Sequence, residues 1–166
     1  MTSFEELYNT YFKRVYAYIF SRVRNAAVAE DLCACTWKKC YEHLNSFNEE
    51  KGEFTQWLFT IARNETNMHW RTYWVKNVFS LAETEDDVPE TSRQTPLEQL
   101  EEANFRADLL RALARLSGKE RDLVSLKFYS GLNNRQIAAV TRLSESNVGT
   151  VIHRAVQKMR RFMENV

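Results

Sequence analysis

The polar side chains between residues 144 and 161 could contact both the base edges and the phosphates of DNA. Apolar residues recur there at helical intervals, at Val148, Ile152, Ala155 and Met159, which predicts a helix with one buried face. Ser144 is a suitable N-cap for that helix. Its opposite face carries groups that can act in a major groove, namely Glu145, Asn147, Thr150, His153, Arg154, Gln157, Lys158 and Arg161.

A shorter apolar pattern precedes this helix and completes a predicted helix-turn-helix. Ile137 and Val140 supply its buried side, and Ala138 is small enough for two helices to cross closely. The turn position that glycine often holds is Arg142, so the turn must tolerate a bulky residue or take a different shape. The alternative interpretation is an ordinary helical hairpin with a solvated polar surface.

A second group of residues could bind single-stranded nucleic acid. Trp70, Tyr73 and Trp74 are interleaved with the cations Arg71 and Lys76 near the end of a predicted helix. Bases stack on aromatic rings, at roughly 1–3 kcal/mol for each base, while cations hold the backbone. The alternative is a helical core with aromatic edges, and the residues alone favour neither interpretation.

Composition indicates an all-α protein. Of 166 residues, 44% are apolar, and only four are Gly and two Pro, which argues against a loop-rich β architecture. The apolar periodicity predicts helices over residues 4–23, 27–44, 54–76, 97–116 and 119–129, with a loop over 45–53. No apolar run reaches membrane-span length and no signal peptide opens the chain, so a soluble, cytoplasmic protein without membrane contact is expected.

Charge is distributed unevenly and divides the chain into three parts. Residues 1–78 have 10 basic and 9 acidic side chains, residues 79–103 have 1 and 8, and residues 104–166 have 12 and 5. We therefore predict domains over 1–78 and 104–166, joined by a flexible acidic linker over 79–103. A polyanionic segment could occupy a channel built for nucleic acid.

Neither a metal site nor enzyme chemistry is expected. Cys33, Cys35 and Cys40 are an odd number of thiols within eight residues, and free thiols in a reducing compartment explain them better than a disulfide or metal ligands. His43, His69 and His153 are scattered, and no phosphate-binding glycine loop or nucleophile motif occurs. We predict no cofactor.

Four motifs over nearly the whole chain resemble those of a known family. Residues 29–32 read AEDL, residues 153–155 read HRA, and residues 54–64 read FTQWLFTIARN, close to the family pattern FxxWLFxIARN. The fourth motif, LPxxxRxxxxLxxxxG, fits Leu116, Glu120, Arg121, Leu126 and Gly131. The chain thus resembles bacterial RNA polymerase sigma factors of the extracytoplasmic-function (ECF) type.

The resemblance implies a non-enzymatic subunit that binds core RNA polymerase and directs promoter-specific transcription initiation. It implies two small helical domains: a region 2-like bundle of three or four helices and a region 4-like helix-turn-helix domain. The acidic linker would lie in the RNA exit channel and mimic RNA. The partners implied are core polymerase, double- and single-stranded promoter DNA, and an anti-sigma factor as a further candidate.

The resemblance also assigns candidate site residues to three tasks. Reading of the upstream, minus-thirty-five element is assigned to Arg135, Ser144, Glu145, Ser146, Asn147, Thr150, His153, Arg154, Gln157, Lys158 and Arg161. Recognition and melting of the minus-ten element is assigned to Asn45, Phe47, Asn48, Lys51, Arg63, Asn64, Asn67, Trp70, Arg71 and Trp74. Binding of the polymerase clamp is assigned to Asp31, Leu32, Ala34, Cys35, Lys38 and Lys39.

Several positions depart from the family pattern. Ala34 stands where Gln is usual, and Met68 where Asp is expected. Gly149 and Val151 replace Lys and Arg in the recognition helix, which predicts fewer phosphate contacts and a shallower salt dependence. The alternative function is a stand-alone helix-turn-helix regulator that binds DNA without polymerase.

Overall fold

Helices form most of the structure, which is a computed structural model describing residues 2–76 and 96–165. The N-terminal part contains α1 (Phe4–Val23), α2 (Ala26–His43) and α3 (Phe54–Lys76). The C-terminal part contains α4 (Pro96–Ala114), α5 (Gly118–Ser125), a π-helical turn (Leu126–Ser130), α6 (Asn134–Thr141) and α7 (Glu145–Glu164). No β-strand occurs within the described ranges, so the all-α prediction is confirmed.

Local hydrogen bonds set the ends of the first helices. Ser3 and Glu6 form a capping box, in which the Ser3 N–H donates to Glu6 Oε2 (2.8 Å) and the Glu6 N–H donates to Ser3 Oγ (3.2 Å). Arg24 ends α1 in the left-handed conformation, with φ of 53°. Asn25 then caps α2 by accepting a hydrogen bond from the Val28 N–H (3.0 Å).

Aromatic side chains hold α1, α2 and α3 together. Tyr18 of α1 and Phe59 of α3 are fully buried, with their rings edge to face and their centroids 5.7 Å apart. Trp37 of α2 packs against Tyr8 of α1, with centroids 5.0 Å apart. The aromatic residues of α1 therefore serve packing, which explains their helical spacing in the sequence.

Capping residues and two left-handed residues shape the C-terminal part. Ser117, Asn133 and Ser144 cap α5, α6 and α7, each accepting a hydrogen bond from the backbone N–H three residues later. Gly131 ends the π-helical turn with φ of 71°. Arg142 occupies the turn between α6 and α7 with φ of 62°, so the turn keeps the left-handed shape and tolerates a bulky residue.

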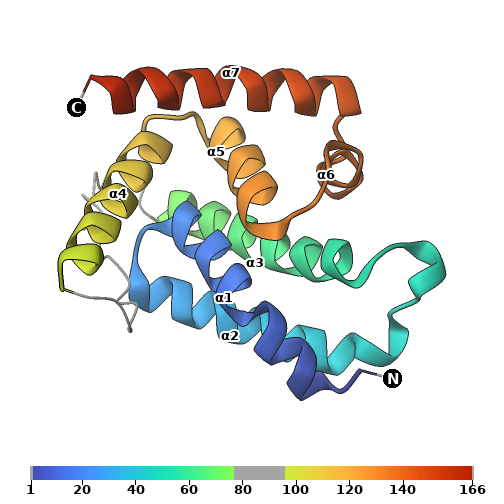
Figure 1. Ribbon diagram of the computed structural model, residues 1–166. Coiled ribbons are helices and arrows are strands. Elements are labelled where there is room, and N and C mark those ends of the chain that lie inside the picture. The colour runs from blue at the N-terminus through green and yellow to red at the C-terminus, as the bar shows by residue number, and fades with distance from the viewer. Residues whose placement is uncertain (1, 77–95, 166) are drawn as a thin grey trace.

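The long helix α7 runs along one side of the molecule, across α4, α5 and α6 (Figure 1). Val148, Ala155 and Met159 on its inner face are buried, and Ile152 is half-buried. Ile137 of α6 is fully buried beside them. The predicted apolar stripe thus forms the contact between the recognition helix and the rest of its domain.

The two parts of the chain pack directly against each other. Helix α1 contacts α5 and the π-helical turn, and α3 contacts α6. One continuous hydrophobic cluster includes Tyr18 and Phe59 from the first part and Leu123 and Ile137 from the second. The sequence predicted two helical bodies, but nothing in it indicated that they would share this interface.

Part of the predicted linker falls outside the structure. Of residues 79–103, those up to 95 lie outside the described residues, and residues 96–103 belong to α4. Within the described ranges, no helix is long and apolar enough to cross a membrane.

Candidate nucleic-acid interface

The outer face of α7, the turn before it and the first turn of α6 carry the candidates for reading duplex DNA. The exposed ones are Arg135, Ser144, Glu145, Ser146, Thr150, His153, Arg154, Lys158 and Arg161, and the half-buried ones are Asn147 and Gln157. Because the apolar stripe turns inward, the candidates within α7 lie on the side of the helix that faces away from the domain, whereas Arg135 belongs to α6. Among the exposed ones, four are cations and one is a carboxylate, which favours approach to a polyanion.

One cation of this face is paired within the protein. Lys158 Nζ lies 2.6 Å from Glu120 Oε1, which links α7 to the first turn of α5. The hydrogen bond from Lys158, together with that from the Ser117 backbone N–H, lowers the pKa of the Glu120 carboxyl. The Lys158 side chain stays 58% exposed while it links α7 to α5.

The two unusual positions in α7 have different surroundings. Gly149 is half-buried and lies at the edge of the outer face, next to Asn134 of α6. A Cβ atom there would meet Asn134 Nδ2 at 3.5 Å, an ordinary contact, so the site accepts a side chain. Val151 is half-buried and packs against the core, so this apolar residue serves packing.

The connection between α2 and α3 forms a small polar pocket. Two short 3-10 helices, Leu44–Ser46 and Glu49–Lys51, replace the predicted loop. Together with the start of α3 they border a pocket of about 270 Å³. The half-buried ring of Phe47 lines this pocket and packs against Trp57, with 5.3 Å between the ring centroids. The exposed candidates of this connection are Asn45, Asn48 and Lys51.

The minus-ten candidates on α3 divide between solvent and the C-terminal part. Asn64 and Arg71 are exposed, Asn67 and Trp70 are half-buried, and the Trp74 side chain lies outside those that the structure describes. Trp70 packs edge to face with Tyr73, at 5.4 Å between centroids, and lines a pocket with Arg121 of the C-terminal part. Its ring is therefore neither fully in the core nor on an open surface.

Five of the six clamp candidates on α2 are exposed. These are Asp31, Ala34, Cys35, Lys38 and Lys39. Leu32 is 9% exposed and lies in the core, as its place in the apolar periodicity of α2 indicated. Lys39 forms an ion pair with the buried Glu65 of α3, and the hydrogen bond that Lys39 donates to the Glu65 carboxylate raises the pKa of Lys39. This pair ties the exposed face of α2 to the bundle.

The thiols do not converge on one site. Cys33 and Cys40 are buried and Cys35 is exposed. Burial raises the pKa of the Cys33 thiol to about 12 and that of Cys40 to about 11. Within residues 2–76 and 96–165, no three His, Cys, Asp or Glu side chains are placed to hold a metal ion.

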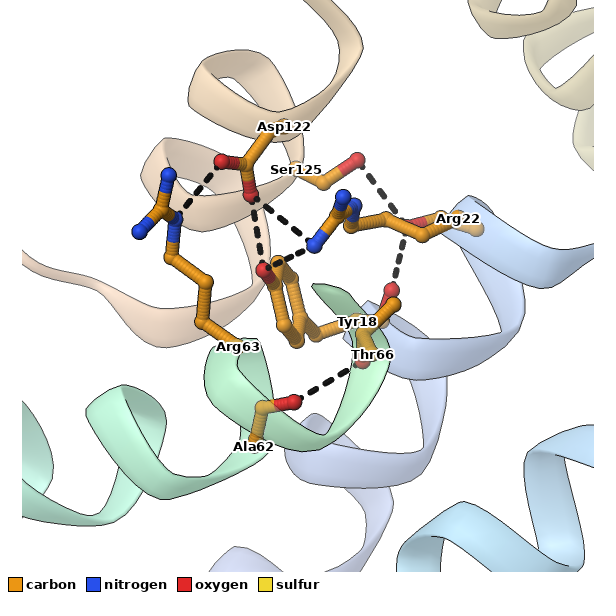
Figure 2. Close-up of polar contacts among 8 residues, drawn as sticks. Tyr18, Arg22, Ala62, Arg63, Thr66, Asp122 and Ser125 are labelled. Carbon is orange, nitrogen blue, oxygen red and sulfur yellow. Dashed lines mark hydrogen bonds and ion pairs between the residues drawn. The ribbon is translucent and has the colours of Figure 1, made fainter. Parts of the chain in front are cut away.

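Sequence reasoning missed the polar cluster between the two parts, which Figure 2 shows. Asp122 of α5 accepts hydrogen bonds from Tyr18 Oη of α1 and from Arg63 Nε of α3, both at 2.7 Å. Burial, and next the charge of Asp122, raises the pKa of Tyr18 above its usual range, so the phenol stays protonated and donates. The partners are more than fifty residues apart in the chain, so no local motif marks them.

Comparison with known proteins places both halves of this arrangement in one family. Residues 7–75 match Sigma-70 region 2, and residues 106–159 match Sigma-70, region 4. The ECF RNA polymerase sigma factor BldN of Streptomyces coelicolor is 31% identical over 163 residues, which cover 97% of this chain and 60% of BldN. The RNA polymerase sigma factor YlaC of Bacillus subtilis is 28% identical over 161 residues, covering 97% of this chain and 92% of YlaC.

A solved structure shares the fold. The sigma factor RpoE from Bartonella quintana, in its complex with the anti-sigma factor NepR, matches with a TM-score of 0.80 and 22% identity, covering 97% of this chain and 96% of that one. A helical region 2 and a helix-turn-helix region 4 in one chain define a sigma factor. This chain belongs to the ECF family of RNA polymerase sigma factors.

The family membership decides between the alternatives considered from the sequence. Sigma factors bind core RNA polymerase and promoter DNA and direct transcription initiation, and they are not enzymes. The match to region 2, in addition to the helix-turn-helix, sets aside a stand-alone regulator.

Proposed function

We propose that this chain recruits core RNA polymerase through the exposed face of α2, reads the minus-thirty-five element with α7, and opens the minus-ten element with the α2–α3 connection and α3. The observation that carries this proposal is the pairing, in one chain, of a region 2 match with a region 4 match whose recognition helix presents an exposed, cationic outer face. The chain would work in the cytoplasm, where the polymerase is, and would supply no catalytic chemistry of its own.

The three surfaces suit three different tasks. The outer face of α7 is long and polar, as a major-groove helix requires. The pocket beside Phe47 combines an aromatic wall with the polar groups of Asn48 and Lys51, which suits an unstacked base. The exposed residues of α2 lie on the bundle side away from its core, where a clamp helix could pack.

The domain division remains part of the proposal. We assign residues 1–78 to polymerase binding and the minus-ten element, 79–103 to the linker, and 104–166 to the minus-thirty-five element. The charge of −7 over residues 79–103 supports the placement of that segment in the RNA exit channel. An anti-sigma factor is a further candidate partner, because RpoE of Bartonella quintana was solved in complex with one.

Transcription in a purified system tests the function. Core bacterial RNA polymerase would be mixed with the protein and with a duplex library randomised across the promoter, and transcript 5′ ends would be sequenced. We expect two enriched sequence elements upstream of a common start. Transcripts that are the same with and without the protein would exclude a sigma function.

Two arginines of α7 provide a matched test of the recognition helix. Arg154 is exposed on the outer face, whereas Arg160 is also exposed but lines a groove with Phe105 and Met163 on the α4 side. We expect Arg154→Ala to weaken binding of polymerase holoenzyme to the selected upstream element by about 1–3 kcal/mol, and Arg160→Ala to change it little. Footprints in which the two variants lose the same protection would mean that the outer face is misplaced.

A further inference from the structure

The polar cluster between the two parts of the chain uses a residue that the proposed function assigns to DNA. Arg63 is a minus-ten candidate, yet in this structure its Nε donates to Asp122 Oδ2 at 2.7 Å. The Arg63 side chain is 23% exposed and that of Asp122 is 7% exposed. A phosphate cannot take the same donor while Asp122 holds it, so the contact and promoter binding exclude each other at this atom.

Both carboxylate oxygens of Asp122 contact residues of the N-terminal part. Its Oδ1 accepts from Tyr18 Oη at 2.7 Å and lies 3.5 Å from Arg22 Nη1, while its Oδ2 faces Arg63 (Figure 2). Next to it, Ser21 Oγ of α1 and Ser125 Oγ of α5 are 2.9 Å apart and buried. One carboxylate therefore joins α5 to both α1 and α3.

The cluster carries more positive than negative charge. Arg22 and Arg63 face the single carboxylate of Asp122, and Arg121 lies close enough that Arg24 and Arg22 lower its pKa, after the larger effect of burial. Partly buried cations that outnumber the anions around them are unfavourable. A polyanion such as promoter DNA therefore offers these arginines a competing partner, and the closed arrangement depends strongly on Asp122.

We propose that Asp122 is a latch, which holds the C-terminal part against α1 and α3 in the free protein and withholds Arg63 until the two parts separate for promoter binding. The withholding of Arg63 rests on the proposed function, whereas the closure itself does not. The latch would restrict the free protein, so that DNA is engaged mainly once polymerase has separated the two parts.

Thiol labelling measures opening in the free, full-length chain. Ser21 is 1% exposed and faces Ser125 across the interface, so Ser21→Cys in a Cys35→Ser background places a reporter that reacts with a maleimide only when the interface opens. Cys40, fully buried in the N-terminal bundle, reports global unfolding in the same sample. We expect Asp122→Asn to raise the labelling rate of the reporter on the order of 30-fold, as removal of one partner of a buried charge pair does.

The control is Asp108→Asn, which also removes a carboxylate but from an ion pair within α4, with Arg111 at 2.6 Å. Labelling of the reporter should not change in this variant, and labelling of Cys40 should stay slow in both. An unchanged reporter rate in Asp122→Asn would overturn the latch, whether or not the protein is a sigma factor. Equal acceleration of the reporter and Cys40 would also overturn it, because the loss would then be one of folding.

A disulfide across the interface tests whether closure withholds Arg63 from the promoter, and it leaves Asp122 unchanged. A disulfide between Ser21→Cys and Ser125→Cys would hold the interface shut, since the two native Oγ atoms are 2.9 Å apart. We expect the oxidised chain to lose at least about tenfold of its promoter-specific transcription with core polymerase, and reduction to restore it. Full activity of the locked chain would overturn the withholding of Arg63, whereas inactivity of the reduced chain would count against the sigma function and leave closure to be judged by labelling.

Discussion

The turn of the helix-turn-helix stores backbone strain that one substitution should relieve. Arg142 adopts φ of 62° between α6 and α7, and its side chain is exposed. The left-handed region costs an L-residue roughly 1–2 kcal/mol, because its Cβ approaches the following carbonyl oxygen. Glycine has no Cβ and avoids this cost, but it raises the conformational entropy of the unfolded chain, which offsets about 0.4–1 kcal/mol of the gain.

We therefore expect Arg142→Gly to raise the free energy of unfolding by about 0.5–1 kcal/mol. For a chain of this size, that corresponds to an increase of about 1–4 °C in Tm. Urea unfolding followed by circular dichroism, with the midpoint and slope compared with those of the parent protein, measures the change. Because the turn keeps its shape, affinity for the selected upstream element should stay the same.

The matched control is Arg154→Gly, which makes the same replacement at an exposed position in the middle of α7. There the backbone is right-handed, so glycine should lower the free energy of unfolding by about 1 kcal/mol. The two substitutions should thus have opposite signs. If Arg142→Gly destabilised the protein as Arg154→Gly does, the strain argument would be refuted, and the Arg142 side chain would have to stabilise the turn.

Two further predictions concern thiol reactivity and salt dependence. In native protein at pH 8, iodoacetamide should modify Cys35 and largely spare Cys33 and Cys40, because these two thiols are buried and their pKa values are raised to about 12 and about 11. Peptide mass spectrometry with and without urea measures the modification of each cysteine. Equal rates for the three cysteines in native protein would contradict the prediction. Gly149 lies at the edge of the outer face of α7 and accepts a Cβ atom, so a lysine side chain there could reach a phosphate. Gly149→Lys should steepen the slope of log binding constant against log salt concentration for the selected duplex by about 0.9, which corresponds to one phosphate contact. An unchanged slope in a salt titration would place this position away from the DNA.

The helix boundaries were predictable because their causes are local. Ser3 bonds to Glu6 and Ser117 to Glu120, so each capping box is written within four consecutive residues. The apolar period identified the inner face of α7, including Val148. The helix expected over residues 119–129 begins one residue earlier, at Gly118, and its last turn is π-helical from Leu126 to Ser130.

The candidate site was predictable only in part. The outer face of α7 followed from the inner face, because a helix with one buried stripe exposes the rest. Leu32 was assigned to clamp binding because it belongs to the AEDL motif, although its place in the apolar periodicity of α2 already indicated that it is buried. The surroundings of Trp70 depend on α5, and those of Arg63 depend on Asp122, so their partial burial could not be inferred from α3 alone.

The sequence by itself determined where the helices begin and end, which face of each is apolar, and which family the motifs resemble, because those signals act between residues a few positions apart. Only the tertiary structure decided that Asp122 meets Tyr18 and Arg63 and that the two parts close on each other. The interactions concerned join side chains 104 and 59 positions apart, and a chain pattern with periods of three or four residues carries no information about such distant pairs.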